Sequence, residues 1–441
     1  MSPGAAATAT PEATADERGR RPSLRERLLA DFQRVRGFTE AVTSDLAPED
    51  CVVQSMPDVS PTKWHLAHTT WFFETFVLKK WVPGYQLEVP EYAYLFNSYY
   101  NAAGDMHRRD LRGLISRPTV DETRRYRTAV NSHVAELMES ANDELLTEME
   151  PILVLGMHHE QQHQELLITD IKHVFSQNPL YPVFRRSNLV RTADAAQPMN
   201  FVEFEEEIVE MGHSGAGFSY DNEGPRHRAL IAAGAIASRP VTNGEYLEFM
   251  DAGAYVRSEF WLSLGWTTVN EQRWQAPLYW IKRDGEWWNF TLSGIRKIEP
   301  TEPVTHVSYF EADAFANWAG ARLPTEFELE RVASQQEIRG NFVEDEHFHP
   351  QPAPAGGDDQ IRQVFGDTWE WTRSSYSPYP GYRAEPGALG EYNGKFMCNQ
   401  YVLRGGSCAT SRTHIRPTYR NFFQPEKRWQ FTGIRLARDP R

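Results

Sequence analysis

The chain has 441 residues, of which 40% are hydrophobic and 24% charged, an ordinary balance for a globular protein. This length suffices for two or three domains, each with its own core. The net charge of −14 argues against a general nucleic-acid binder, which usually carries a basic face. Three cysteines are too few for a disulfide framework or a zinc knuckle, and no apolar run approaches the ~20 residues that span a bilayer. We therefore expect a cytoplasmic protein of several domains that binds neither nucleic acid nor membranes.

The first part of the chain is predicted to be helical. Residues 1–22 are rich in Ala, Thr, Pro and charge, so we expect a disordered tail there. Apolar residues then recur with a helical period over 24–42. A second helix is expected over about 62–78, with Thr62 as its N-cap. A third is expected over about 120–149.

The fourth predicted helix carries the most informative pattern in the sequence. No Gly or Pro interrupts residues 157–177, which predicts one long helix. His159 and His163 are four residues apart, so they lie one turn apart on one face and can bind one metal ion. His65 and His68, near the start of the second helix, are both candidates for a third ligand. Helical bundles build metal centres from such inward-pointing side chains.

The residues alone leave other interpretations of this helix open. The string from His159 to His163 also fits the zinc-peptidase pattern His-Glu-x-x-His, in which Glu160 would be the general base. The metzincin extension of that pattern fails, because Leu166 and Thr169 occupy its Gly and third His positions. A thermolysin-like site with a downstream Glu stays open, as does a polar helix face that binds nothing. Imidazole suits Zn, Cu, Ni and Fe alike, so histidines do not define the metal.

After an aperiodic linker at 186–199 the chain changes character. Residues 200–441 are rich in Gly, Pro and Trp and favour short strands, turns and aromatic packing. A short capped helix is expected within 240–249, and another begins after Thr325, with Glu328 completing a capping box. The expected fold class is α+β, with a helical bundle followed by a loop-rich domain of small sheets.

Several strings resemble known families. Residues 23–185 look like a DinB-like four-helix metal-binding domain, and residues 200–441 look like a formylglycine-generating-enzyme-type (sulfatase-modifying) domain, a variant of the C-type lectin fold. The marks of the second domain are Asp221-Asn-Glu-x-Pro-x-His227, Pro240-Val-Thr-Asn243, Arg322-Leu-Pro-Thr-Glu326, Gly366-Asp-Thr-Trp-Glu-Trp371, Arg404-Gly-Gly-Ser407 and Gly433-Ile-Arg-Leu436. The two domains in this order resemble the ergothioneine-biosynthesis sulfoxide synthases (EgtB-type), which are non-heme iron enzymes. The resemblance covers nearly the whole chain.

The resemblance implies which residues form the reaction centre. The family's three histidine ligands to iron(II) correspond to His68, His159 and His163. The tyrosine pair of the cysteine-using branch corresponds to Tyr99 and Tyr100, and in that branch a tyrosine beside the iron is the proposed proton or hydrogen-atom donor. These five residues are the expected metal and catalytic groups.

The resemblance also implies how substrates are held. Gln162 corresponds to a glutamine near the substrate's imidazole, and Asn421 to the asparagine that holds the trimethylammonium-bearing substrate. Phe422, which follows Asn421, is also expected to bind substrate. The branch that uses gamma-glutamylcysteine carries an acidic residue shortly after that asparagine, whereas Phe422 and Phe423 follow it here. This departure favours L-cysteine as the thiol donor. Tyr379 resembles the catalytic-tyrosine region of the other branch, so it stays an alternative to the tyrosine pair.

The resemblance thus implies an Fe(2+)- and O2-dependent sulfoxide synthase that joins L-cysteine to the imidazole C2 of hercynine (trimethylhistidine). Alternatives in the same class are an ovothiol- or selenoneine-type relative and gamma-glutamylcysteine as donor. Alternatives in other classes are a zinc peptidase and a non-catalytic lectin-like binding module. Formylglycine-generating activity is not expected, because Cys398 and Cys408 do not match the reactive cysteine pair of those enzymes.

Overall fold

The structure is a computed structural model that describes residues 22–187, 196–215, 217–357, 360–384, 390 and 393–440. The chain divides into two compact units. The first takes the chain up to Leu167 together with the segment Ser214–Ser219, and most of the rest, from Ile168 on, belongs to the second. Helices make up the first unit and small sheets with short helices the second, which confirms the predicted α+β class.

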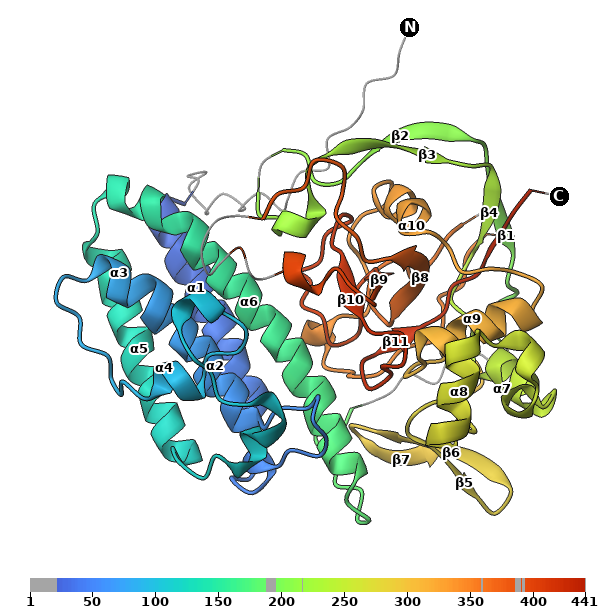
Figure 1. Ribbon diagram of the computed structural model, residues 1–441, viewed down its shortest axis with the longest axis horizontal. Helices are drawn as coiled ribbons and strands as arrows, with labels where there is room; N and C mark the ends of the chain where they lie inside the picture. Colours follow the sequence, from blue (N-terminus) through green and yellow to red (C-terminus); the bar gives the residue numbers. More distant parts are fainter. Residues whose placement is uncertain are drawn as a thin grey trace, which may run out of the picture. The chain divides into compact units, whose positions relative to one another are not determined.

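The long helices of the first unit can be followed in Figure 1: α1 (Leu24–Thr43), α2 (Thr62–Phe73), α5 (Val120–Ser140) and α6 (Asp143–Ser176). A π-helical turn, Glu74–Leu78, continues α2. The shorter elements are α3 (Lys79–Trp81), α4 (Tyr92–Leu95) and the 3-10 turns Asp50–Val52, Asn101–Ala103 and Arg109–Leu114. The last turns of α6, beyond Leu167, belong to the second unit.

The start of α2 differs from the prediction. Thr62 is the first helical residue and Pro61 occupies the N-cap position, with no side-chain cap. Proline fixes its own φ, here −58°, and its ψ of 143° is extended, so the chain turns into the helix directly after it. The prediction of Thr62 as N-cap is therefore wrong. By contrast, α1 begins with a capping box formed by Ser23 and Glu26.

The third predicted helix, 120–149, is two helices in the structure. α5 ends at Ser140 and α6 begins at Asp143. Asn142 separates them, because its side-chain oxygen accepts a hydrogen bond from the backbone N–H three residues on (2.8 Å), the geometry of an N-cap. α6 also begins earlier than predicted, since Pro151 is accommodated within it with an exposed side chain.

A glycine lets the two histidine-bearing helices approach each other. A Cβ at Gly156 of α6 would lie 2.8 Å from ring atoms of Phe72 and Phe73 of α2. Gly156 stands three residues before His159, so any larger residue would separate α2 from α6 just where both carry histidines. Every side chain of α2 is buried, which makes this helix the centre of the bundle.

The second unit contains several small sheets (Figure 1). Their strand orders are β10-β9-β8-β11, β1-β4-β12, β5-β6-β7 and β2-β3. The strands are β1 (Phe201–Phe204), β2 (Glu207–Met211), β3 (His227–Ile231), β4 (Gly234–Ala237), β5 (Trp280–Arg283), β6 (Glu286–Thr291), β7 (Gly294–Lys297), β8 (Trp369–Ser375), β9 (Tyr401–Arg404), β10 (Asn421–Phe423), β11 (Thr432–Gly433) and β12 (Ala437–Arg438). β10 lies at the edge of its sheet, antiparallel to β9.

The helices of the second unit are α7 (Asn243–Asp251), α8 (Ser263–Gln272), α9 (Tyr309–Trp318) and α10 (Glu326–Ala333). Short 3-10 turns cover Asp221–Glu223, Ala254–Val256, Ser258–Phe260, Val343–Asp345 and Gly394–Phe396. α7 begins with a capping box on Thr242, and α10 with one formed by Thr325 and Glu328. Both predicted short helices are thereby confirmed.

Some predictions about the chain's organisation stay predictions. The domain bounds 1–22, 23–185, 186–199 and 200–441 are among them. Residues 1–21 of the predicted tail and 188–195 of the predicted linker lie outside the described residues. Among the helices that the structure describes, none has the length and apolar character needed to cross a membrane.

A buried lysine lies where α6 ends in the second unit. The Nζ of Lys172 donates to Nε2 of His306 (2.7 Å) and lies 4.7 Å and 5.0 Å from the ring centroids of Phe431 and Tyr279. Burial lowers the pKa of Lys172 from 10.5 to about 7. Burial and the neighbouring Lys172 also hold the pKa of His306 well below its usual range, so this imidazole is the neutral acceptor.

We expect Lys172 to make stability rise between about pH 7 and pH 10. The folded-state pKa lies below the unfolded value, so the unfolded chain binds more protons in this window and the free energy of unfolding increases with pH. Below pH 7 the lysine is protonated in both states and its contribution is constant. Lys172→Met should reduce the rise by on the order of 3 kcal/mol in urea unfolding. An equally steep rise in the variant would contradict the buried, deprotonating lysine.

Candidate metal centre

Three buried histidines converge within the first unit. His68 comes from α2, and His159 and His163 come from successive turns of α6. One ring nitrogen from each lies within 4.8 Å of the others, and Nε2 of His68 is 3.1 Å from Nε2 of His159. Two nitrogens that each bind one ion at about 2.0–2.1 Å lie about 3 Å apart. The three side chains therefore fit a single metal ion.

The hydrogen bond of His68 defines which of its nitrogens can bind a metal. Nδ1 donates to the backbone carbonyl of Phe96 (2.5 Å), so the proton sits on Nδ1 and the lone pair on Nε2. Nε2 is the atom that faces His159. A ring nitrogen held by a carbonyl in this way is the usual outer support of a metal-binding histidine, because it fixes both tautomer and ring orientation.

The electrostatics keep the three imidazoles neutral. Burial is the main cause that lowers the pKa of each, to about 3 for His159 and well below the usual range for His68 and His163. Neighbouring histidines and the guanidinium of Arg112 lower the pKa of His68 and His163 further. Neutral imidazole is the form that binds metal, so the site has its donors ready at neutral pH.

Two tryptophan rings stack on the imidazole of His68. Trp64 stacks at 4.5 Å with an interplanar angle of 13°, and Trp71 at 5.7 Å with 18°. Arg112 in turn lies over Trp64, 3.4 Å from the ring centroid, and donates to the hydroxyl of Ser60 (2.9 Å). This stack holds the imidazole plane. Arg112 was not among the predicted site residues.

His65, the other predicted candidate for a third ligand, lies beside the three histidines. Its Nδ1 is 2.9 Å from Nδ1 of His163. It therefore contacts one candidate ligand and does not belong to the set whose nitrogens converge. The geometry favours His68 over His65. That His68, His159 and His163 bind a metal stays a prediction.

Glu160 has a different environment from the general base of a peptidase. Its fully buried carboxylate accepts hydrogen bonds from Arg36 (2.7 Å) and Thr39 (2.6 Å) and forms an ion pair with Arg127. Burial raises its pKa, but Arg127 and Arg36 outweigh this and bring the pKa to about 2. A general base needs a pKa nearer the working pH and access to water. Glu160 therefore cannot serve the zinc-peptidase alternative.

The two predicted catalytic tyrosines differ in their surroundings. Tyr100 is fully buried, and its ring lies 5.8 Å from Trp71 and 5.4 Å from Phe76. Tyr99 is half-buried, with its ring 5.0 Å from that of Tyr100. Asn97 shapes this loop, because its side chain donates to the backbone carbonyl of Tyr100 (3.1 Å). The loop also contains the carbonyl that holds His68.

The residues predicted to bind substrate occur in both units and are Gln162, Asn421 and Phe422. Gln162 is half-buried on α6, between His159 and His163 in sequence. In the second unit Asn421 begins the edge strand β10 and accepts a hydrogen bond from the backbone N–H of Phe422 (2.9 Å). These assignments stay predictions.

Phe422 belongs to a small aromatic cluster of the second unit. Its ring stacks on Tyr376 at 4.0 Å and 11°, and on Phe396 at 6.0 Å and 26°. Phe422 is half-buried in β10. An accessible aromatic face attracts cations such as quaternary ammonium groups.

Tyr379, the alternative catalytic tyrosine, lies inside a buried charge network. Its hydroxyl donates to Glu326 (3.2 Å) and accepts from Arg404 (3.0 Å), and Arg420 lies over its ring at 3.9 Å. Burial, the main cause, raises the pKa of Tyr379 far above its usual range. These contacts give Tyr379 a structural role that ties α10 to β9.

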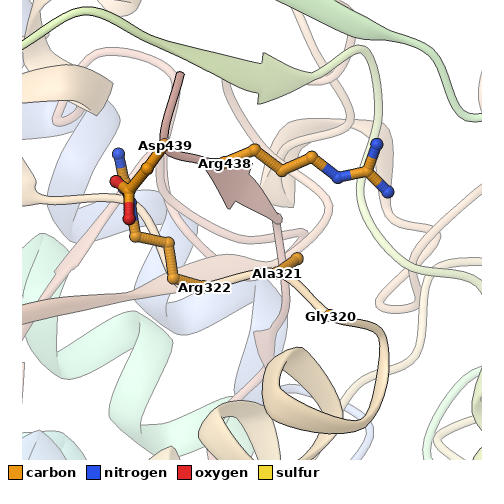
Figure 2. A pocket seen from close by; sticks show the side chains of 5 residues that line it. All are labelled: Gly320, Ala321, Arg322, Arg438 and Asp439. Atoms are coloured by element: carbon orange, nitrogen blue, oxygen red, sulfur yellow. The ribbon is translucent and has the colours of Figure 1, made fainter. Parts of the chain in front are cut away.

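Figure 2 shows a pocket in the second unit that contains none of the predicted site residues. It is lined by Gly320, Ala321, Arg322, Arg438 and Asp439. Arg322 donates to Asp439 (2.6 Å) and forms a second ion pair with Glu328 (2.7 Å). Arg322 and Asp439 are thus paired within the fold.

Comparison with known proteins gives the class to which this combination belongs. Residues 31–167 match the DinB superfamily, and residues 192–360 and 357–440 match the sulfatase-modifying factor enzyme 1-like domain. The chain combines a DinB-superfamily domain with a sulfatase-modifying-type domain, as its sequence motifs indicated.

Three relatives narrow this class. The hercynine oxygenase of Mycobacterium tuberculosis is 30% identical over 449 residues, covering 94% of this chain and 99% of that protein. That of Mycolicibacterium smegmatis is 37% identical over 244 residues, 50% of this chain and 56% of the relative. Ergothioneine biosynthesis protein 1 of Schizosaccharomyces pombe is 28% identical over 235 residues, 50% of this chain and 28% of the relative. This chain belongs to the hercynine oxygenase family and is an oxidoreductase, which confirms the resemblance inferred from the motifs.

Proposed function

We propose that this protein is an iron(II)- and dioxygen-dependent sulfoxide synthase that joins L-cysteine to the imidazole C2 of hercynine in ergothioneine biosynthesis. The observation that carries the proposal is the buried set of neutral His68, His159 and His163 in a chain of this family. In the overall reaction the thiol S–H and the imidazole C2–H are lost and a C–S bond forms. One oxygen atom of O2 becomes the sulfoxide oxygen and the other leaves as water.

Iron is the metal that best fits both the three histidine ligands and a reaction with dioxygen. Three neutral imidazoles resemble the facial triad of non-heme iron oxygenases, which leaves further positions for substrates. Iron(II) held there would supply the redox chemistry that dioxygen needs. The chain's own part is to hold the ligands neutral and oriented, which the burial of the site and the Phe96 carbonyl accomplish.

Tyr99 is the tyrosine that we assign to proton or hydrogen-atom donation. Tyr100 is enclosed by Trp71, Phe72 and Phe76, which leaves it a packing role. Tyr99 is half-buried in the same loop and can meet a substrate. The loop that carries Tyr99 also supports His68 through the Phe96 carbonyl, which supports this assignment.

The family resemblance assigns residues of this chain to two chemically distinct groups of hercynine. Gln162, beside the ligands on α6, is assigned to the imidazole. Asn421 and Phe422 are assigned to the trimethylammonium group, because aromatic rings attract cations. Orienting both organic substrates at one centre converts a three-body encounter into an organised one.

L-Cysteine is the proposed thiol donor. Phe422 and Phe423 stand where an acidic side chain would assist the larger donor gamma-glutamylcysteine. A small-molecule thiol is kept reduced in the cytoplasm, which is the compartment we propose for the reaction.

The proposal is tested by oxygen uptake with protein loaded with iron(II) under anaerobic conditions. Hercynine is supplied with either L-cysteine or gamma-glutamylcysteine, and the products are identified by mass spectrometry. We expect rapid uptake with hercynine plus cysteine and a product with the mass of the sulfoxide adduct. Absence of uptake with both thiols would contradict the function. Uptake with gamma-glutamylcysteine alone would contradict only the choice of donor.

A further inference from the structure

One buried carboxylate joins helices of the bundle next to the histidine set. Glu160 of α6 accepts hydrogen bonds from Arg36 (2.7 Å) and Thr39 (2.6 Å), both on α1. It also forms an ion pair with Arg127 of α5. Glu160 directly follows His159 in the chain, so α1 and α5, which carry none of the three histidines, contact α6 at the point where its ligands begin.

The same two arginines also bind α2. Nη2 of Arg36 donates to the hydroxyl of Thr70 (3.0 Å), and Nη1 of Arg127 donates to that of Thr69 (3.2 Å). Thr69 and Thr70 are the two residues after His68. Each guanidinium therefore links the helix that carries His68 to the carboxylate beside His159.

The remaining guanidinium contacts leave little freedom for either arginine to turn. Nε of Arg36 donates to Asn131 of α5 (2.6 Å), and Nη2 of Arg127 also donates to the backbone carbonyl of Arg36 (3.0 Å). Both side chains are almost wholly buried. The planar fork of arginine can satisfy several acceptors in fixed directions at once, which the single ammonium of lysine cannot do.

We propose that Arg36 and Arg127 are positioning residues of the metal centre, which set the register of α2 against α6 through Thr69, Thr70 and Glu160. The inference rests on the proposed metal site. A metal site tolerates ligand displacements of about 0.2 Å. A helix rotation of about 10° moves an atom about 6 Å from the helix axis by about 1 Å. Because the ligands come from two helices, the contacts that prevent such rotation decide whether three nitrogens meet at one point.

A positioning role and a merely structural role of these arginines predict different effects on metal affinity. Loss of a buried contact that only stabilises the bundle lowers the free energy of unfolding and leaves the metal affinity of the folded protein unchanged. Loss of a positioning contact weakens metal binding in protein that is still folded. Outer supports of metal ligands typically contribute about 10- to 100-fold in affinity.

The test measures the affinity of the full-length protein for Fe(II) and Co(II) by chelator competition, with the visible Co(II) spectrum as a report of coordination geometry. Arg36→Lys keeps the charge and removes the fork, and Thr70→Val removes one acceptor with little change of shape. Leu28→Ala is the matched control, because Leu28 is buried on α1 two turns before Arg36 and is not part of the network.

We expect Arg36→Lys to weaken metal binding about 10- to 100-fold and shift the Co(II) bands, Thr70→Val to weaken it less, and Leu28→Ala to leave it unchanged. Unaltered affinity in both Arg36→Lys and Thr70→Val would overturn the proposal. An equal loss in Leu28→Ala would overturn it too, because the effect would then follow general stability. If Arg36→Lys does not fold, the near-isosteric Thr70→Val decides alone. This experiment measures metal binding without substrates. Its result therefore does not depend on whether the protein catalyses the proposed reaction, which the oxygen-uptake experiment tests.

Discussion

His68→Ala is expected to lower metal affinity by more than about 100-fold, beyond the loss that outer supports of metal ligands cause. His68 supplies the only candidate nitrogen from α2 in the converging set, while the other two come from α6. Without His68 only two histidines would coordinate the ion, which would then dissociate more readily. Oxygen uptake with hercynine and cysteine should be lost in the same variant. Metal content after desalting and the uptake rate are the measurements.

His65→Ala provides the matched control for this prediction. His65 lies one turn earlier on α2, and its Nδ1 contacts Nδ1 of His163 at 2.9 Å. As an outer partner of a ligand it should contribute about 10- to 100-fold in affinity, less than His68. The reverse order, with His65→Ala the more damaging change, would mean that His65 is the third ligand.

Glu160→Ala is expected to lower the free energy of unfolding by ~3–5 kcal/mol, because it leaves the buried guanidiniums of Arg36 and Arg127 without their carboxylate. Glu40→Ala removes a different partner of the same Arg127, at 3.3 Å, whose carboxylate is 55% exposed. An exposed carboxylate of this kind contributes ~0–1 kcal/mol. Urea unfolding of the two variants gives the comparison.

This pair of variants also separates the buried ion-pair role from catalysis by Glu160. A general base could be removed with little loss of stability, since catalytic side chains seldom hold a fold together. Near-equal stability of Glu160→Ala and the unmodified protein would therefore contradict the role that its contacts indicate. A Glu160→Ala variant as unstable as expected, beside a stable Glu40→Ala, would leave the peptidase interpretation without its base.

The sequence predicts part of the metal centre from spacing alone. His159 and His163 follow from the i, i+4 rule, because both lie on one uninterrupted helix. The choice between His65 and His68 does not follow, since both stand at the start of α2 and the answer depends on how α2 is rotated against α6. Here the family resemblance named His68, and the geometry agrees with it.

The buried contacts of Arg36 and Arg127 with Glu160 were not predicted from the sequence, although the sequence contains one sign of them. Arg36 falls on the buried stripe of α1, four residues after Phe32 and three before Thr39. A charged residue in such a stripe requires a buried partner, but a sequence does not say which of the other helices supplies it. The partner, Glu160, lies 124 residues further along the chain.

The errors at helix ends have local causes. The boundary between α5 and α6 was missed because the helical pattern continues through it, although Asn142 followed by Asp143 and Glu144 is a signal of a helix start. At α2, Pro61 displaced Thr62 from the N-cap position. The correctly predicted Thr325 and Glu328 show that a capping box is the more reliable mark.

The sulfoxide-synthase function is tested most directly by isotope labelling of a single turnover. Hercynine deuterated at imidazole C2 is mixed with L-cysteine, the iron(II)-loaded protein and 18O2. The mass of the product is then measured by mass spectrometry. Formation of a C–S bond at C2 with oxygen from O2 predicts an adduct that has lost the deuterium and gained one 18O atom. Recovery of hercynine with its deuterium intact, and cysteine oxidised only to cystine, would contradict the proposed function.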